Sequence, residues 1–244
     1  MENNISMDDL ISIEAIKQEA SAMYLSPEVD KYIKDHALVL DVFYGDNLVK
    51  KTECAYQHLL FNWNLDDGFC PKIIVTTDEI NKLVYYISRE VEETLINLNS
   101  KSPLIITILN GGLIFSNSLL KTFKFPYDKD YVTCNFYPHE TFIGNIGNIG
   151  SYKHIPDIDQ YDSIILVDDI LDTGKTMREI LNYIKADLKF SKPIYPVTLL
   201  KRENSPNIDN HIYGKLIKDE WVAGYGMNDK DGYSRLIDFI FEEK

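Results

Sequence analysis

The stretch that decides the fold is Ile164-Ile165-Leu166-Val167, which continues into Asp168-Asp169-Ile170-Leu171-Asp172 and then Thr173-Gly174-Lys175-Thr176. A short, continuous apolar run is typical of a strand buried on both faces of a sheet. After the loop, apolar residues recur at helical spacing: Met177, Ile180, Leu181, Ile184 and Leu188. The stretch therefore predicts a buried strand, an acidic turn and a helix.

Similar units surround this one. Strand-like runs cover residues 73–75, 104–109, 131–136 and 195–200. The first is followed by Thr76-Thr77-Asp78-Glu79, a capping-box pattern that opens a helix, and the second by Asn110-Gly111-Gly112 and another helical pattern. Apolar strands that alternate with helices predict an α/β fold with a parallel, twisted sheet flanked by helices.

Residues 1–72 differ from the rest because they carry no recognisable chemical motif. Their apolar spacing predicts helices near residues 11–23 and 50–62. We therefore expect a mainly helical N-terminal accessory extension over residues 1–72 and an α/β core over residues 73–200. Residues 201–244 form the third expected region.

Charge and composition exclude several classes of function. The chain has 244 residues, is 45% apolar and carries a net charge of -13. That charge disfavours binding to nucleic acid or to an anionic membrane, which needs clustered basic residues. Three cysteines in no metal-binding spacing, and no apolar run long enough to cross a bilayer, favour a cytoplasmic protein.

The loop at Thr173-Gly174-Lys175-Thr176 is a candidate phosphate site. The first N–H groups of a helix lack partners within the helix, and the helix dipole favours an anion there. A nucleoside-triphosphate P-loop ends similarly, but it needs a glycine five residues before Gly174, where this chain has Asp169. A sugar phosphate is the better expectation.

The acids beside this loop have two interpretations. In the structural one, Asp168, Asp169 and Asp172 are solvated loop residues and a helix cap. In the chemical one, adjacent carboxylates accept hydrogen bonds from the vicinal hydroxyls of a ribose whose phosphate occupies the loop. Ligands of parallel sheets bind at the carboxyl ends of the strands, where both this loop and Asn110-Gly111-Gly112 fall.

The acidic run resembles the diphosphoribosyl-diphosphate (PRPP) signature of type I phosphoribosyltransferases, and more narrowly of the hypoxanthine–guanine members. The resemblance extends over roughly residues 73–240. It implies that Asp168 and Asp169 contact the ribose hydroxyls directly or through Mg²⁺. It also implies that Asp172 is the general acid/base at N7 of the purine and that Thr173, Gly174, Lys175 and Thr176 bind the 5-phosphate.

Other site residues follow from the same resemblance. Asn110-Gly111-Gly112 resembles the pyrophosphate loop, in which a non-proline peptide, cis in this family, turns N–H groups toward the leaving group, and Arg235 corresponds to an arginine that engages pyrophosphate. Lys201 occupies the place of the lysine that reads the purine 6-oxygen. Trp221 and Val222 resemble a C-terminal hood, residues 201–244, over the base. A surface position for Lys201 and core packing for Trp221 are the alternatives.

The chain departs from the family pattern at two places. Asn228 stands where an aspartate ligates a second magnesium, and the neighbouring Asp229 is an alternative ligand. The flexible loop, expected within residues 137–161, has Pro138-His139-Glu140 where a Ser-Tyr pair is usual, and Ser151-Tyr152 comes later. These departures bear on the substrate more than on the fold.

The resemblance implies an enzyme that joins a 6-oxopurine, hypoxanthine or guanine, to PRPP with Mg²⁺ and releases pyrophosphate. It further implies a homo-oligomer, a dimer or tetramer. One alternative is a regulatory protein that senses ligands with this fold. Another is a transferase for xanthine, adenine or a pyrimidine, since base choice depends on few contacts.

Overall fold

The computed structural model describes residues 31, 33–35, 72–136, 141–143, 158–228 and 234–243. The chain divides into two compact units, Met1–Cys70 and Pro71–Lys244. In the first unit, residues 31 and 33–35 are helical. The helices expected near residues 11–23 and 50–62 lie outside the described residues, so the helical character of the extension stays a prediction.

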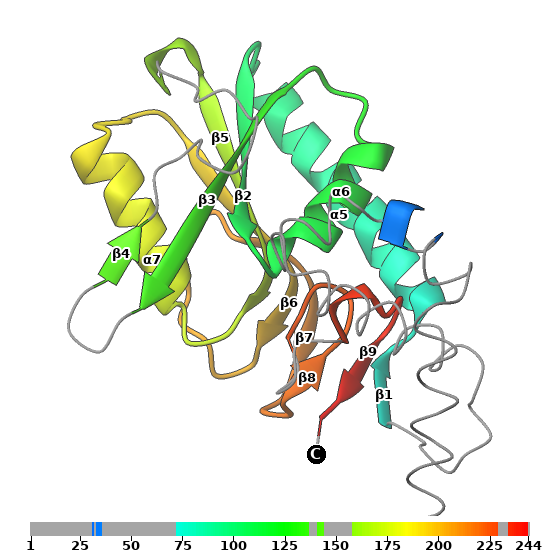
Figure 1. The fold of residues 1–244 in the computed structure, drawn as a ribbon. Helices are drawn as coiled ribbons and strands as arrows, with labels where there is room; N and C mark the ends of the chain where they lie inside the picture. Colours follow the sequence, from blue (N-terminus) through cyan, green and yellow to red (C-terminus); the bar gives the residue numbers. More distant parts are fainter. Residues whose placement is uncertain are drawn as a thin grey trace, which may run out of the picture. The chain divides into compact units, whose positions relative to one another are not determined.

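The second unit is built on a six-stranded sheet in the order β4-β3-β2-β5-β6-β7 (Figure 1). The strands are β2 (Pro103–Leu109), β3 (Asp128–Phe136), β4 (Thr141–Ile143), β5 (Ser163–Leu171), β6 (Ile194–Arg202) and β7 (Ile212–Ile217). All neighbours pair in parallel except β3 and β4, which are antiparallel. The predicted α/β fold with a parallel sheet is confirmed.

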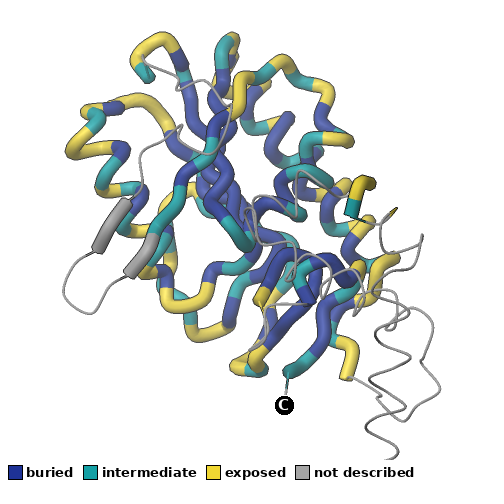
Figure 2. The backbone as a smooth tube through the Cα atoms, in the orientation of Figure 1, coloured by how far each residue is buried: buried dark blue, intermediate teal, exposed yellow. Residues whose placement is uncertain are grey.

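Helices cover both faces of this sheet (Figure 1). Helix α5 (Thr77–Asn97) and helix α6 (Gly112–Thr122) pack on one face around Ile87, Phe115 and Val167. Helix α7 (Lys175–Asn182), which continues as a π-helical turn over Tyr183–Asp187, packs on the other face. Figure 2 shows that the central strands between the two helical layers are buried along their length.

The predicted start of α5 is confirmed in detail. Thr76 is the N-cap, and its side-chain oxygen accepts a hydrogen bond from the Glu79 N–H at 3.3 Å. The buried face carries Ile80, Val84, Ile87, Val91 and Leu95, the residues that recur at helical spacing. A capped amphipathic helix therefore follows directly from this part of the sequence.

Several strands differ from the expectation. Strand β1 (Lys72–Val75) does not join the parallel sheet but pairs with β9 (Ile240–Glu242), which pairs with β8 (Val222–Ala223) in a small antiparallel sheet. Strand β7 was not predicted, because Gly214 and Lys215 interrupt its apolar pattern at the edge of the main sheet. The boundaries proposed at residues 73, 200 and 201 stay a prediction.

The stretch over residues 137–161, expected as a loop, is described only in part. Residues 141–143 form β4, and Ile158–Gln160 is a short 3-10 turn, η1. The glycine-rich repeat, Pro138-His139-Glu140 and Ser151-Tyr152 lie outside the described residues. Among the described helices, none is long and apolar enough to cross a membrane.

Register brings the two glycine-bearing loops together. Strands β2 and β5 are adjacent and parallel, with Thr107 opposite Val167. The Asn110-Gly111-Gly112 turn follows the end of β2, and the acidic loop begins in the last residues of β5. Both loops therefore leave the same edge of the sheet side by side.

Candidate active site

A cavity of about 310 Å³ lies at this edge. It is lined by the end of β2, the acidic loop, the start of α7 and two C-terminal residues: Ile108, Leu109, Gly111, Cys134, Asp168, Asp169, Ile170, Leu171, Asp172, Thr173, Gly174, Lys175, Thr176, Met177, Asn228 and Arg235. Residues far apart in sequence but predicted for one site thus share one cavity. We call this cavity the sugar-phosphate end.

Two adjacent carboxylates are buried in the wall of this cavity. Asp168 is 8% exposed and Asp169 is 9% exposed. The Asp168 Oδ1 accepts from the Asp169 N–H at 3.0 Å, and the Asp169 Oδ1 accepts from the Ile170 N–H at 2.7 Å. Burial, reinforced by the charge of Asp169, raises the pKa of Asp168 well above its usual range. Such a pair favours a neutralising cation or hydroxyl donors.

The pKa of Asp169 is also raised, chiefly by burial. Its hydrogen bonds with Asp168 and the Ile170 N–H, together with the positive charge of Arg235, oppose that rise. The two acids are therefore not equivalent. Asp169 is the one that Arg235 stabilises in the charged form.

Glycine is required where the two loops meet. A Cβ built on Gly111 would overlap the carboxylate of Asp169, and one on Gly112 would lie 3.0 Å from the Asp168 Cα. The φ angle of Gly226 is +99°, and a Cβ there would overlap the carbonyl oxygen of Gly111. Close backbone approach therefore brings the β2 turn, the acids and the C-terminal segment into one site.

The loop over residues 173–176 opens a helix, as predicted. Gly174 is the N-cap of α7 with φ of 72°, a left-handed conformation that favours glycine, and no side chain caps it. The Thr173 hydroxyl accepts a hydrogen bond from the Lys175 N–H at 3.3 Å. The start of α7 lies at this cavity, and the first N–H groups of a helix, which have no partner within the helix, favour an anion there.

A second, smaller cavity of about 160 Å³ adjoins the first. It is lined by Asp169, Ile170, Asp172, Arg202, Trp221, Val222, Met227 and Asn228. Trp221 is 60% exposed and lines this cavity, so core packing does not explain it. We call this cavity the base end, because an exposed indole ring beside an apolar wall suits a flat heterocycle.

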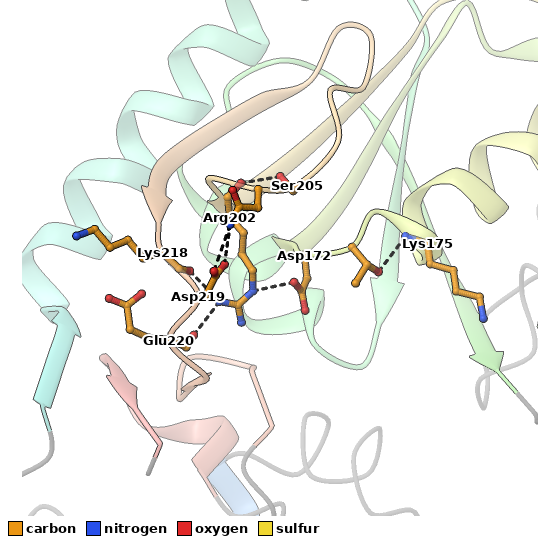
Figure 3. A network of polar contacts seen from close by, with 9 residues as sticks. Asp172, Lys175, Arg202, Ser205, Lys218, Asp219 and Glu220 are labelled. Atoms are coloured by element: carbon orange, nitrogen blue, oxygen red, sulfur yellow. Dashed lines mark hydrogen bonds and ion pairs between the residues drawn. The ribbon is translucent and has the colours of Figure 1, made fainter.

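Two neighbouring cations at the end of β6 take different positions. The Lys201 Nζ donates to the Asn207 Oδ1 at 3.3 Å and lies 5.1 Å from the Tyr213 ring centroid. Lys201 does not line either cavity, whereas Arg202 lines the base end and forms an ion pair with Asp172 (Figure 3). Successive residues of a strand point to opposite faces, so a Lys-Arg pair in sequence does not reveal which one faces the site.

Other predicted site residues lie in the turn after β2 and in the C-terminal segment. The Leu109–Asn110 peptide bond is cis, as the resemblance implied for this loop. Arg235, in the 3-10 turn η3 (Ser234–Leu236), lines the sugar-phosphate end, and its Nη1 donates to the Gly226 carbonyl oxygen. Asn228 lines both cavities. Asp229 lies outside the described residues.

The residues present suit a hard divalent cation bound together with a ligand. Among residues 72–136, 141–143, 158–228 and 234–243, no cluster of three or more His, Cys, Asp or Glu side chains could hold a metal by itself. Asp168 and Asp169 nevertheless supply buried carboxylate oxygens, and Asn228 supplies an amide oxygen in the same cavity. Mg²⁺ characteristically binds one or two carboxylates and completes its shell with substrate oxygens and water.

Comparison with known proteins agrees with this geometry. A family model described as the phosphoribosyl transferase domain matches residues 76–230. The hypoxanthine phosphoribosyltransferase of Buchnera aphidicola is 30% identical over 172 residues, which span 68% of this chain and 92% of that protein. The hypoxanthine-guanine phosphoribosyltransferase of Lactococcus lactis is 30% identical over 182 residues, spanning 71% and 91%.

A solved structure shares the fold. The crystal structure of a hypoxanthine-guanine phosphoribosyltransferase from Bacillus anthracis has a TM-score of 0.59 at 19% identity and covers 71% of this chain and 98% of that one. The matched family model spans the two strand-end loops that form the cavity. With these matches, the chain belongs to the phosphoribosyltransferase family, an enzyme family, and within it resembles the hypoxanthine-guanine phosphoribosyltransferases.

Proposed function

We propose that this protein is a purine-salvage enzyme that transfers the 5-phosphoribosyl group of PRPP to a 6-oxopurine, hypoxanthine or guanine, and releases pyrophosphate. One observation carries the proposal. A buried acid pair, a helix-opening loop and Asp172 line one cavity, and that cavity adjoins a second one that contains an exposed tryptophan. A sugar phosphate and a flat base need these two kinds of surface next to each other.

The sugar-phosphate end supports one role for each part. Asp168 and Asp169 accept hydrogen bonds from the ribose hydroxyls, because carboxylate oxygens are strong hydrogen-bond acceptors. Thr173, Gly174, Lys175 and Thr176 bind the 5-phosphate. The N–H groups at the start of α7 and the left-handed Gly174 support that role.

The pyrophosphate group is assigned to the opposite wall. Asn110, Gly111 and Gly112 bind it through backbone N–H groups, and Arg235 neutralises part of its charge. This assignment is supported by the close approach of Gly111 to the Asp169 carboxylate, which leaves no room for a Cβ. It is also supported by the position of Arg235 in the same cavity.

The base is assigned to the smaller cavity. Trp221 stacks on the purine, and the Val222 backbone meets its edge. Lys201 reads the 6-oxygen after leaving Asn207, to which it is held by one 3.3 Å hydrogen bond between exposed groups. An ammonium can donate to a 6-oxo group, whereas the amino group of adenine would face another donor.

Asp172 is assigned the proton at purine N7. Its side chain is 48% exposed and lines both cavities, so it can reach the base and the reacting carbon together. A positioned acid/base typically contributes about 10²–10⁴ in rate. This role makes Asp172 the residue on which turnover depends most.

Mg²⁺ is the proposed cofactor, held by Asp168 and Asp169 and by Asn228 or Asp229. When bound, it offsets negative charge on the pyrophosphate leaving group. The buried acid pair supports this assignment, since burial raises the pKa of both carboxyl groups and a cation bound beside them would favour their charged forms. Asn228 supplies an oxygen ligand without charge.

We also assign a role to the C-terminal region. Residues 201–244 act as a hood over the base, supported by Trp221, Val222 and Asn228 in the base-end wall. We further propose a cytoplasmic homo-oligomer, a dimer or tetramer, that binds neither nucleic acid nor membranes. The net charge of -13 supports the exclusion of anionic polymers.

Pyrophosphate release by the full chain, with PRPP, Mg²⁺ and each nucleobase in turn, tests the proposal. The expected result is release with hypoxanthine or guanine that stops when EDTA removes the metal. Release with adenine or uracil alone would contradict the substrate assignment. PRPP binding without release with any base would contradict catalysis and favour the ligand-sensing alternative.

A further inference from the structure

Arg202 is a buried cation at the end of β6 that contacts Asp172. Its side chain is 10% exposed, and its Nε lies 2.7 Å from the Asp172 Oδ1 (Figure 3). The backbone that carries it is held by Ser205, whose N–H and hydroxyl both donate to the Arg202 carbonyl oxygen, at 3.1 and 2.7 Å. The guanidinium is therefore placed by a constrained strand end.

The same guanidinium also binds the segment that precedes Trp221. Its Nη1 donates to the Lys218 carbonyl oxygen at 2.9 Å and to the Glu220 carbonyl oxygen at 2.8 Å. Trp221 and Val222 follow immediately and line the base end. One planar group thus links the Asp172 carboxylate to the chain that forms the wall of the base cavity (Figure 3).

The orientation of the Asp172 carboxylate depends on its contact with Arg202. Asp172 lies in the loop between β5 and α7, and its side chain is 48% exposed, so packing alone does not define its orientation. Among the described residues, Arg202 is its one hydrogen-bonding or ionic partner. With Oδ1 bound to Nε, the second oxygen is the one left to meet a base.

A lysine could not make the same set of contacts. A guanidinium donates from a rigid fork in several fixed directions, whereas an ammonium is a single point on a flexible stem. Arg202 uses two separate nitrogens, one for the carboxylate and one for the two carbonyl oxygens. The neighbouring Lys201 is bound to Asn207 instead, so it does not share this task.

We propose that Arg202 is the positioning residue for Asp172: it holds Oδ1 so that Oδ2 faces the purine, and it ties that orientation to the hood segment 218–222. The inference rests on the proposed role of Asp172 in proton transfer. It assigns Arg202 no contact with the reacting atoms. Loss of the guanidinium leaves the loop over residues 173–176 intact and lets the Asp172 carboxylate rotate away from the purine.

A double-mutant cycle on the full chain tests the inference. Pyrophosphate release is measured for the wild type, Arg202→Gln, Asp172→Asn and the double variant, with PRPP and base each varied. Misplacement of a catalytic group by about 1 Å can cost about 10²-fold. We expect Arg202→Gln to lower kcat by about 10- to 100-fold, to change the KM for PRPP by less than about threefold, and to have no further effect in the Asp172→Asn background.

Arg89→Gln is the matched control. Arg89 also forms an ion pair with a carboxylate, Glu92 at 2.6 Å, and donates to a backbone carbonyl, Thr122 at 3.1 Å, but it lies on α5 away from both cavities. We expect kcat to stay within about twofold of the wild type in this variant. Thermal unfolding of each variant shows whether the fold is retained, and Arg202→Lys replaces Arg202→Gln if the latter does not fold.

The outcomes separate two failures. Rate losses of Arg202→Gln and Asp172→Asn that multiply in the double variant, or a wild-type kcat for Arg202→Gln, would overturn the positioning role while the proposed function stands. Wild-type protein that releases no pyrophosphate with any nucleobase would overturn the proposed function itself. A loss of kcat in Arg89→Gln as large as that in Arg202→Gln would also reject the inference, because a general structural effect would then explain both.

Discussion

The two ends of the crevice are built in different ways. The sugar-phosphate end comes mainly from consecutive residues, Asp168 to Thr176, at the end of one buried strand and the start of one helix. The base end combines Asp172 with Arg202, Trp221 and Asn228, which come from other strands and loops. The first depends on local backbone geometry, and the second on how distant segments pack.

This difference explains why the anion site at the start of α7 can be predicted from a short stretch of sequence. N–H groups at a helix start point outward whatever the rest of the fold does, so a short sequence defines an anion site. A base-binding surface has no such local source. Its composition depends on which face of β6 turns toward the cavity, and there the guanidinium of Arg202 occupies the wall while the ammonium of Lys201 lies outside it.

The largest expected effect comes from the residue shared by both ends. Asp172→Asn should keep PRPP binding, because the amide preserves shape, and should lower kcat by about 10²–10⁴, because it cannot exchange the N7 proton. Steady-state pyrophosphate release measures this. Asp187→Asn, an exposed acid in the π-helical turn after α7, is the control and should match the wild type. Wild-type turnover in Asp172→Asn would reject its role.

Glycine substitutions should separate damage to chemistry from damage to folding. In Gly111→Ala the new Cβ overlaps a side chain, the Asp169 carboxylate, which can rotate away. We expect activity to fall by about 10²-fold because a ligand-binding acid is displaced, while the melting temperature changes little. Activity assays and thermal unfolding of the same sample measure both quantities.

Gly226→Ala is the matched opposite case. Its φ of +99° disfavours a side chain, and the Cβ overlaps the backbone carbonyl of Gly111, which cannot rotate away. We expect a loss of about 1–3 kcal/mol in the free energy of unfolding. Denaturant titration measures this loss. Equal stability of the two alanine variants would contradict the distinction between a mobile and a fixed neighbour.

Lys201→Gln tests whether the base end changes when the base binds. If Lys201 leaves Asn207 to donate to the 6-oxygen, its loss should raise the KM for hypoxanthine about tenfold, as expected for a hydrogen bond from a charged donor, with the KM for PRPP unchanged. Lys185→Gln, an exposed lysine on the π-helical turn, is the control. An unchanged KM for the base would leave Lys201 with its present role beside Asn207.

The smallest effect concerns His211, whose Nε2 lies 2.9 Å from the Thr198 Oγ1. Burial, aided by the positive charge of Lys201, lowers the pKa of His211 from 6.5 to about 4. Between these values the unfolded chain binds the proton and the folded protein does not, so stability falls as pH falls from about 6.5 to about 4. Solvent around the partly exposed ring limits the loss to about 1 kcal/mol.

His211→Gln should remove this part of the pH dependence. The unfolding free energy of the wild type and the variant, compared at pH 7 and pH 4.5, isolates it, because all other groups titrate alike in both proteins. Parallel losses in the two proteins would show that His211 is protonated in the folded state as readily as in the unfolded one.

Much of the core was predictable because its signals are local. Thr76 and Glu79 mark the start of α5, and apolar runs mark β2, β5 and β6. Strand β7 was missed because Gly214 and Lys215 disguise an edge strand whose pairing with β6 depends on the sheet already being present. Strand β1 was placed in the wrong sheet, since its partner, β9, comes near the end of the sequence and β1 comes at the start of the unit.

The sequence by itself determined the buried strand, the acidic pair and the helix-opening turn, because each depends on neighbouring residues and on the period of a helix or strand. Only the tertiary structure decided that Gly226 lies against Gly111, that Arg235 reaches the cavity of Asp169, and that Arg202 rather than Lys201 contacts Asp172. The physical reason is that these contacts join residues distant in sequence. Strand register and sheet pairing, which no local pattern encodes, set which of them meet.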